Sequence, residues 1–197
     1  MKHTSRIAIA LLLAGFSACA TVKARLENIP LIWKPTSELD LPPGTVDTIV
    51  RTKIEFDVFK DVRQQPEMIA QNLEDAVPKP VTTRDNVGQF VRTHVREAFY
   101  KAGLNTVDSD GDVIITGEIR QFFVDETTIY KGTVLLRLNV QNHAGEKLWS
   151  GVASGTAKRF GHSYSAENYY EVLSDSVLNA ISSLLRDVEF RKALAQK

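Results

Sequence analysis

Three carboxylates on predicted strands are the first residues of this sequence that could do chemistry. Glu55 and Asp57 lie two residues apart in one strand, and Glu118 lies in another. Paired carboxylates can act as general acid and base if a fold brings them together in a cleft. Arginines and lysines are interleaved with all three, a pattern that is typical of a solvated ionic surface. A protein without catalysis is therefore the main expectation, and an enzyme is the alternative.

The other reactive residue types form no metal or nucleophile motif. An EF-hand loop needs glycine at its sixth position and glutamate at its twelfth, whereas counting from Asp108 places Gly111 fourth and Ile119 twelfth. Residues 151–155 lack the order of a serine-hydrolase elbow. None of the histidines of the mature chain has a second ligand at a zinc-like spacing; they are His94, His143 and His162. No metal site and no cofactor are predicted.

Cys19, the only cysteine, follows an N-terminal leader. Basic residues precede a run of small and apolar residues at 7–15, which is typical of a secretory signal and too short to span a bilayer. The sequence FSAC at 16–19 resembles a bacterial lipobox, in which the cysteine becomes the acylated first residue. Residues 1–18 are thus predicted to be the signal peptide, and Cys19 the lipidation site.

A different cleavage remains as the alternative. Lipoboxes usually carry Leu, Val or Ile at the position of Phe16, and Ala18-Cys19-Ala20 fits ordinary signal peptidase cleavage. That cleavage would discard the cysteine and leave a soluble periplasmic protein. In either case no cysteine remains for a disulfide, so the stability must come from a hydrophobic core.

The charge balance of the sequence bears on its partners. The chain has 24 basic and 24 acidic residues, and removal of the leader with Lys2 and Arg6 leaves a net charge of about −2. This balance argues against nucleic acid as a partner and against strong capture by anionic lipid.

Residues 19–46 are predicted to be the acylated cysteine and a proline-rich tether. At full extension, residues 20–44 would reach at most about 80 Å from a membrane. The segment is nevertheless more apolar than a solvated spacer needs. Either part of it packs along the domain, or it docks onto a partner or the membrane surface with Trp33 as its anchor.

Residues 47–197 are predicted to form a single domain with one core. A hydrophobic period of two predicts strands at 46–58, 113–124, 133–141 and 147–158. Apolar residues three and four apart predict helices at 87–102 and 166–185, with Gly103 as a C-cap and Ser165 as an N-cap. Residues 61–80 show no sustained period.

The predicted order β-α-β-β-β-α gives an α+β fold. It is a two-layer sandwich with an antiparallel or mixed sheet of about four strands and two helices packed on one face. Small residues at 151, 153, 155 and 157 of the last strand are expected to let a helix approach closely. The other face is expected to be open and polar, with these members: Arg51, Lys53, Glu55, Asp57, Thr116, Glu118, Arg120, Arg137 and Asn139.

Several features together resemble the YajG-type lipoproteins of Gram-negative bacteria. The resemblance covers about residues 48–186 and rests on the lipobox, the helix that ends at Gly103, strand openings near 112 and 132, the Trp149 strand, and a strand ending in Asp61-Val62-Arg63. The family form of that last motif is Asp-Asn-Arg. The resemblance implies an outer-membrane anchor and a non-enzymatic role, and related architectures occur in lipopolysaccharide-assembly and synthase-activator lipoproteins. Ala20 and Thr21, which are not aspartate, agree with the outer membrane by the same resemblance.

The sequence therefore predicts a lipoprotein on the periplasmic face of the outer membrane that acts as a non-catalytic binding, scaffold or accessory module. Its expected partners are the membrane, through Cys19, and an envelope protein or glycan. A hydrolase or transferase acting on envelope polymer is the alternative, and a self-assembling structural lipoprotein is a third possibility. The loop at 159–164 is either a binding rim or a connector that caps the core. The candidate binding residues are Trp33, Arg51, Lys53, Glu118, Arg120, Arg137, Phe160 and Tyr164.

Overall fold

The computed structural model describes residues 25–161 and 163–196 of the protein. The predicted signal peptide and the predicted lipidation site at Cys19 lie outside the described residues. The α+β class is confirmed, with three helices and seven strands in the part of the chain that is described. In chain order they are β1 (Ile54–Asp61), β2 (Met68–Asn72), β3 (Lys79–Thr82), α1 (Val87–Lys101), β4 (Thr106–Val107), β5 (Val113–Glu126), β6 (Ile129–Asn142), β7 (Lys147–Phe160), α2 (Ala166–Arg186) and α3 (Val188–Ala195).

The strands form one mixed sheet around β5. β6 pairs antiparallel along one edge of β5, and β1 and β2 pair parallel, one after the other, along the opposite edge. β7 lies outside β6, while β4 and β3 lie outside β1 and β2. The predicted sheet of about four strands is too small, because β2, β3 and β4 have only 5, 4 and 2 residues. Strands this short carry too little hydrophobic pattern to be recognised locally.

The predicted first strand is wrong over its first half. The N–H of Ile49 donates to Val46 O at 2.9 Å, and the N–H of Thr52 donates to Ile49 O at 3.1 Å. These bonds close successive turns and bury Ile49 and Thr52, so that the alternation of apolar residues comes from turns rather than from extended chain. The strand β1 begins only at Ile54.

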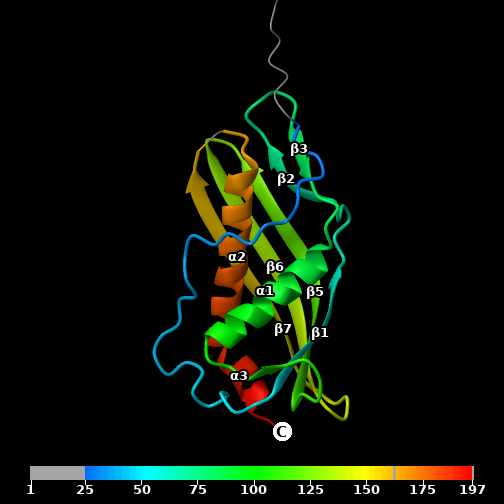
Figure 1. Ribbon diagram of the computed structural model, residues 1–197, viewed down its shortest axis with the longest axis vertical. Helices are drawn as coiled ribbons and strands as arrows, with labels where there is room; N and C mark the ends of the chain where they lie inside the picture. The colour runs from blue at the N-terminus through cyan, green and yellow to red at the C-terminus, as the bar shows by residue number, and fades with distance from the viewer. Residues whose placement is uncertain (1–24, 162, 197) are drawn as a thin grey trace, which may run out of the picture.

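All three helices cover the same face of the sheet (Figure 1). α2 packs on β6 and β7, and α1 packs on β1. The sequence missed α3, whose N-cap Asp187 accepts hydrogen bonds from the N–H groups of Glu189 and Phe190. The ring of Phe190 lies 5.0 Å from Trp149 and 6.3 Å from Phe99, measured between centroids, and closes one end of the core.

The predicted end of α1 is confirmed. Gly103 has a φ of +85°, its N–H donates to Tyr100 O at 2.9 Å, and the N–H of Leu104 donates to Phe99 O at 3.1 Å. This is a Schellman motif, which needs the left-handed conformation that glycine adopts without strain. Ser165 holds the N-cap position of α2, but its side chain makes no capping hydrogen bond. Among the described helices, none is long and apolar enough to cross a bilayer.

Candidate functional site

Residues 25–46 form a strap that crosses the helical face of the domain, over α2 (Figure 1). Of the two explanations for the proline-rich segment, packing along the domain is the one observed for these residues. The apolar side chains of the strap that pack against the core are Leu26, Ile29, Leu31, Trp33, Leu39, Leu41 and Val46.

Asp175 of α2 is the main polar anchor of the strap. Its carboxylate accepts hydrogen bonds from the main-chain N–H and the hydroxyl of both Thr36 and Ser37, at distances of 2.8, 2.5, 3.1 and 2.9 Å. One residue earlier in α2, Ser174 Oγ accepts the N–H of Lys34 at 2.9 Å. These bonds fix the middle of the strap to the outer side of α2.

A second set of contacts is ionic. Lys34 of the strap pairs with Glu167 and, at 3.2 Å, with Glu171 of α2. Glu171, whose side chain is only 8% exposed, also pairs with Arg159 of β7. Neighbouring cations stabilise a buried carboxylate, because its negative charge has lost the solvation by water. Removing either Lys34 or Arg159 would leave the charge of Glu171 less well compensated. Glu171 thus links the strap, α2 and β7.

Replacing Asp175 with alanine is expected to loosen the middle of the strap while the domain stays folded. The freed donors are exposed enough to bond water, so the local cost is about 1–2 kcal/mol. Hydrogen exchange at Thr36 and Ser37 should then be about 5–30-fold faster. The matched control is Asp40→Ala, which removes an exposed pair with Arg186. Equal protection in both variants would contradict the role of Asp175.

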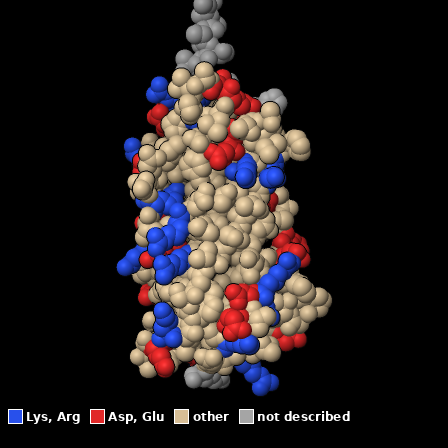
Figure 2. Space-filling view, turned by 180° about the vertical axis from the view of Figure 1, so that it is seen from behind, with Lys and Arg blue, Asp and Glu red and all other residues tan. Residues whose placement is uncertain are grey.

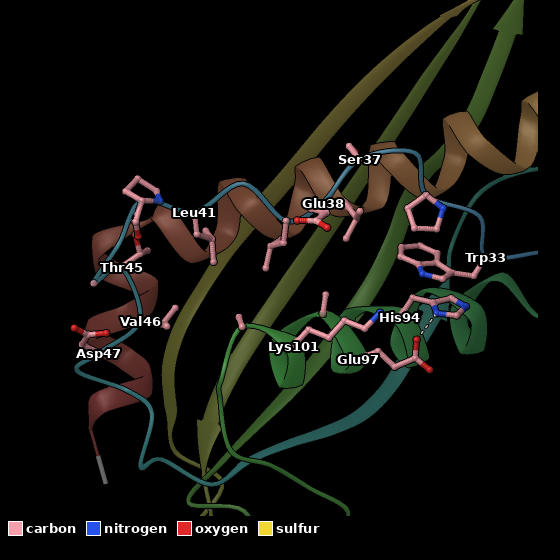
Figure 3. A pocket seen from close by; sticks show the side chains of 17 residues that line it. Trp33, Ser37, Glu38, Leu41, Thr45, Val46, Asp47, His94, Glu97 and Lys101 are labelled. Atoms are coloured by element: carbon pink, nitrogen blue, oxygen red, sulfur yellow. Dashed lines mark hydrogen bonds and ion pairs between the residues drawn. The ribbon is translucent and has the colours of Figure 1, made fainter.

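A groove of about 690 Å³ lies between the strap and α1 (Figure 3). This volume is typical of a site for a small ligand. Its walls include Leu39 and Leu41 of the strap and Leu178 of α2, and its charged lining residues are Glu38, Asp47, Glu97 and Lys101. Carboxylates outnumber ammonium groups here, which favours a neutral or cationic ligand over an anion.

Trp33 lies at one end of this groove (Figure 3). Its ring stacks on His94 of α1, with centroids 4.2 Å apart and planes 9° apart, and Phe90 makes a T-shaped contact with each of these rings. His94 Nδ1 lies 2.9 Å from Glu97 Oε2. In this structure Trp33 therefore packs on its own domain, and the histidine takes part in that packing.

The face of the sheet opposite the helices is uncovered, as predicted, but its middle is less charged than predicted. Figure 2 shows charged side chains mainly along the flanks and ends of this face. One row across β5, β6 and β7 holds Glu118, Arg137 and Val152. The neighbouring rows are uncharged: Phe123, Thr133 and Thr156; Gln121, Leu135 and Ser154; Thr116, Asn139 and Ser150.

The structure does not bring Glu55 and Glu118 together. Glu55 lies beside Ile114 of β5, and Glu118 is four residues further along that strand, a separation of about 13 Å at the rise of a β-strand. Glu118 pairs with Arg120 at 2.5 Å, and Glu55 Oε2 accepts the N–H of Gly111 at 3.2 Å. Each carboxylate has its own surface contact, and the two do not form an acid–base pair.

The other predicted binding residues do not gather at one place. Arg51 lies in the turns before β1, and Lys53 directly precedes the first residue of β1, so neither belongs to a strand. Arg120 and Arg137 are exposed on β5 and β6, and Phe160, which is 90% exposed, ends β7. The structure therefore assigns these residues to three separate regions of the surface.

Tyr164 belongs to a buried polar cluster that the sequence did not reveal. Glu126, at the end of β5, is fully buried and accepts the N–H of Tyr164 at 3.0 Å and the hydroxyl of Tyr169. Burial, together with the bond to Glu126, raises the pKa of Tyr169 above its ordinary value. Tyr164 Oη accepts the N–H of Leu26 at 3.2 Å and donates to Pro80 O at 3.3 Å. This loop thus caps the core and fastens the start of the strap.

Asp61 and Arg63, from the motif that carries the family resemblance, form a nearly buried ion pair. Arg63 Nε donates to Asp61 Oδ1 at 2.9 Å and Nη2 to Oδ2 at 2.6 Å. Nη1 also donates to Met68 O at 2.8 Å and to Phe122 O at 3.0 Å. The guanidinium therefore ties β1, β2 and β5 together. In the described part of the chain, no group of three or more His, Cys, Asp or Glu is placed to hold a metal ion.

No protein-family model matches the sequence, and no curated protein matches it. Solved structures that resemble the fold include a Xanthomonas campestris protein assigned to the family DUF330. It has a TM-score of 0.55 and 13% sequence identity, and the alignment covers 77% of this chain and 90% of that one.

Further similar structures have TM-scores below 0.5. PelC from Paraburkholderia phytofirmans, solved as a dodecamer, has a TM-score of 0.41 and 11% identity over 67% of this chain and 87% of that one. A lipoprotein from Neisseria meningitidis has a TM-score of 0.36 and 12% identity over 57% of this chain and 88% of that one. The YajG-type resemblance stays a prediction from the sequence. What the comparisons show is that the chain shares the fold of the Xanthomonas protein.

Proposed function

We propose that the protein is a non-catalytic binding module of the bacterial cell envelope, held at the outer membrane by a lipid on Cys19. Its partner is an envelope protein that adds an extended segment to the free edge of β7. The leader, the lipobox and the resemblance to YajG-type lipoproteins support the anchor and the address. The sheet supports the binding mode.

The free edge of β7 is the observation that carries this proposal. Among the described strands, β7 pairs only with β6, along its whole length of 14 residues. Its charged residues stand near the two ends, and residues 148–157 contain no charge and no proline. Natural sheets usually protect such edges with charges, prolines or short strands. Apart from Thr156 O, which accepts a hydrogen bond from Asn179 Nδ2 of α2 at 2.8 Å, this edge is a template for a partner strand through main-chain hydrogen bonds.

The surroundings of β7 fit the same role. The opposite edge of the sheet is already occupied at β3, where Thr82 exchanges main-chain bonds with Leu26 and Ile29 of the strap. In the middle of β7, the side chains that face away from α2 are Ser150, Val152, Ser154 and Thr156, all small or apolar, and Val152 is 61% exposed. An added strand would thus border few charged side chains, chiefly Arg137 beside Val152 and Lys158 near the end of β7, and would desolvate few ions.

Absence of catalysis is part of the proposal. The carboxylates that an envelope hydrolase would use are about 13 Å apart along the sheet and are engaged with Arg120 and the amide of Gly111. Neither carboxylate lines the groove beside the strap. A purified protein that turns over an envelope polymer, with loss of activity in Glu118→Gln, would contradict this part.

One set of experiments tests both the lipid anchor on Cys19 and the partner site on the edge of β7. A photo-crosslinking residue at Ser154 or Val152 of the full-length protein, expressed in its own envelope, is expected to give one adduct of defined mass. The matched control is the same residue at Tyr100, which is 71% exposed on α1. Adducts that are equal at all three sites, or absent from β7, would reject the edge. A wild-type protein whose mass spectrum shows no lipid on Cys19 would reject the anchor.

A further inference from the structure

Hydrogen bonds at the start of the strap determine where the described chain joins the domain. Leu26 O accepts the N–H of Thr82 at 3.0 Å, and the N–H of Ile29 donates to Thr82 O at 2.8 Å. Leu26 also donates its N–H to Tyr164 Oη. The strap therefore begins like a further strand beside β3, and from Leu26 onward the chain is part of the folded domain.

This attachment shortens the distance at which a lipid on Cys19 could hold the domain. Arg25 is six residues beyond Cys19, and six extended residues reach at most about 20 Å. The reach of about 80 Å that follows from the sequence treats residues 20–44 as free chain. The strap instead holds most of that segment on α2 and β3.

Three loops lie at the same end of the domain as Leu26, which we call the exit end. They are residues 73–78, residues 127–128, and the described residues of 161–165, which are 161 and 163–165. The sheet places them together, because Asn72 lies beside Glu126 in β5 and Phe160 lies beside Ile129 in β6. Figure 1 shows the exit end at the top, opposite α3.

The exit end exposes apolar side chains on its loops and strand ends. Phe160 is 90% exposed, Val77 is 74% exposed and Leu73 is 37% exposed. Lys158 and Arg159 directly precede Phe160, with Arg159 paired to Glu171, and Lys79 follows the loop of Val77 and pairs with Asp75 of that loop. These apolar groups stand on separate tips rather than in a groove, so they offer little shape for a protein partner. A fluid headgroup layer needs no complementary shape, and it accepts aromatic side chains beside basic ones.

We propose that the exit end rests on the bilayer surface, with Phe160 and Val77 inserted among the lipid headgroups. The proposal rests on the lipid anchor given under Proposed function. The short link between Cys19 and Arg25 favours a lipid surface over a second protein at the exit end. A protein partner would have to fit between the membrane and the domain, in a gap that six residues span.

Depth-dependent quenching tests this orientation. Acylation places the lipid on the sulfur of Cys19, the only cysteine, so Val77→Cys or Phe160→Cys adds a single reactive thiol to the full acylated protein. A fluorophore there, in vesicles of phosphatidylethanolamine and phosphatidylglycerol with headgroup spin labels, should be quenched at least about threefold more than at a distant site. The matched control is Val188→Cys, because Val188 is 52% exposed and begins α3 at the opposite end.

The outcomes separate this proposal from the one it rests on. Equal quenching at all three sites of a protein with an acylated N-terminus, as verified by mass spectrometry, overturns the orientation and leaves the anchor standing. A protein that lacks the lipid overturns both. Crosslinking of Val77→Cys to a second copy, without quenching by lipid, would assign the exit end to an oligomer interface and also overturn the orientation.

Discussion

Replacing Arg63 with alanine is expected to lower the free energy of unfolding by about 3–5 kcal/mol, the range for breaking a buried ion pair. Only 8% of the Arg63 side chain and 15% of the Asp61 side chain are exposed. The variant would leave the carboxylate without its cation and the carbonyls of Met68 and Phe122 without a donor. Urea denaturation followed by circular dichroism measures the change.

Two variants separate the effect of the two parallel hydrogen bonds of the Arg63 guanidinium from the effect of its positive charge. Arg63→Lys keeps the positive charge but cannot make the two parallel bonds to Asp61, so an intermediate loss of about 1–3 kcal/mol is expected. Arg120→Ala removes an exposed pair with Glu118 and should cost less than about 1 kcal/mol. If Arg63→Ala were no more destabilising than Arg120→Ala, the ion pair would not hold the three strands together.

Long elements with a regular hydrophobic period could be predicted from the sequence. β5, β6, β7, α1 and α2 are each 14 residues or longer, so their period is visible without knowledge of their neighbours. β2 and β3 are short and exist because β5 and the start of the strap pair with them. Their formation depends on contacts far apart in the sequence, which local patterns do not record.

The binding residues could be predicted less well than the fold. A strand-end glutamate such as Glu126 looks in the sequence like any surface carboxylate, and its burial becomes evident only when the loop of Tyr164 closes over it. The sequence indicates Trp33 as an apolar anchor, but the surface that it contacts, on His94 and Phe90, lies some sixty residues away in the sequence. A free edge such as that of β7 is a property of the strand order, which the sequence left open.

Replacing Gly155 with alanine is expected to cost about 3 kcal/mol, at the upper end of the range for overpacking a core. A Cβ at this position would lie 2.1 Å from Ser176 O and 2.3 Å from Ala180 N, both in the backbone of α2. Backbone cannot rotate away as a side chain can, so the helix would have to move off the sheet. The small-residue face that the sequence predicted for this strand therefore sets how closely α2 packs.

Gly145→Ala is the matched control, because Gly145 has a φ of +82° and a Cβ there would meet no atom within 4 Å. It should cost only the strain of the left-handed conformation, about 1–2 kcal/mol. Melting of both variants, followed by near-UV circular dichroism of the aromatic side chains, compares the two costs. Equal losses would mean that α2 is free to shift. A larger loss at Gly155 would mean that the helix presses directly on β7, so that its packing helps to hold this strand flat along the edge where we expect the partner to bind.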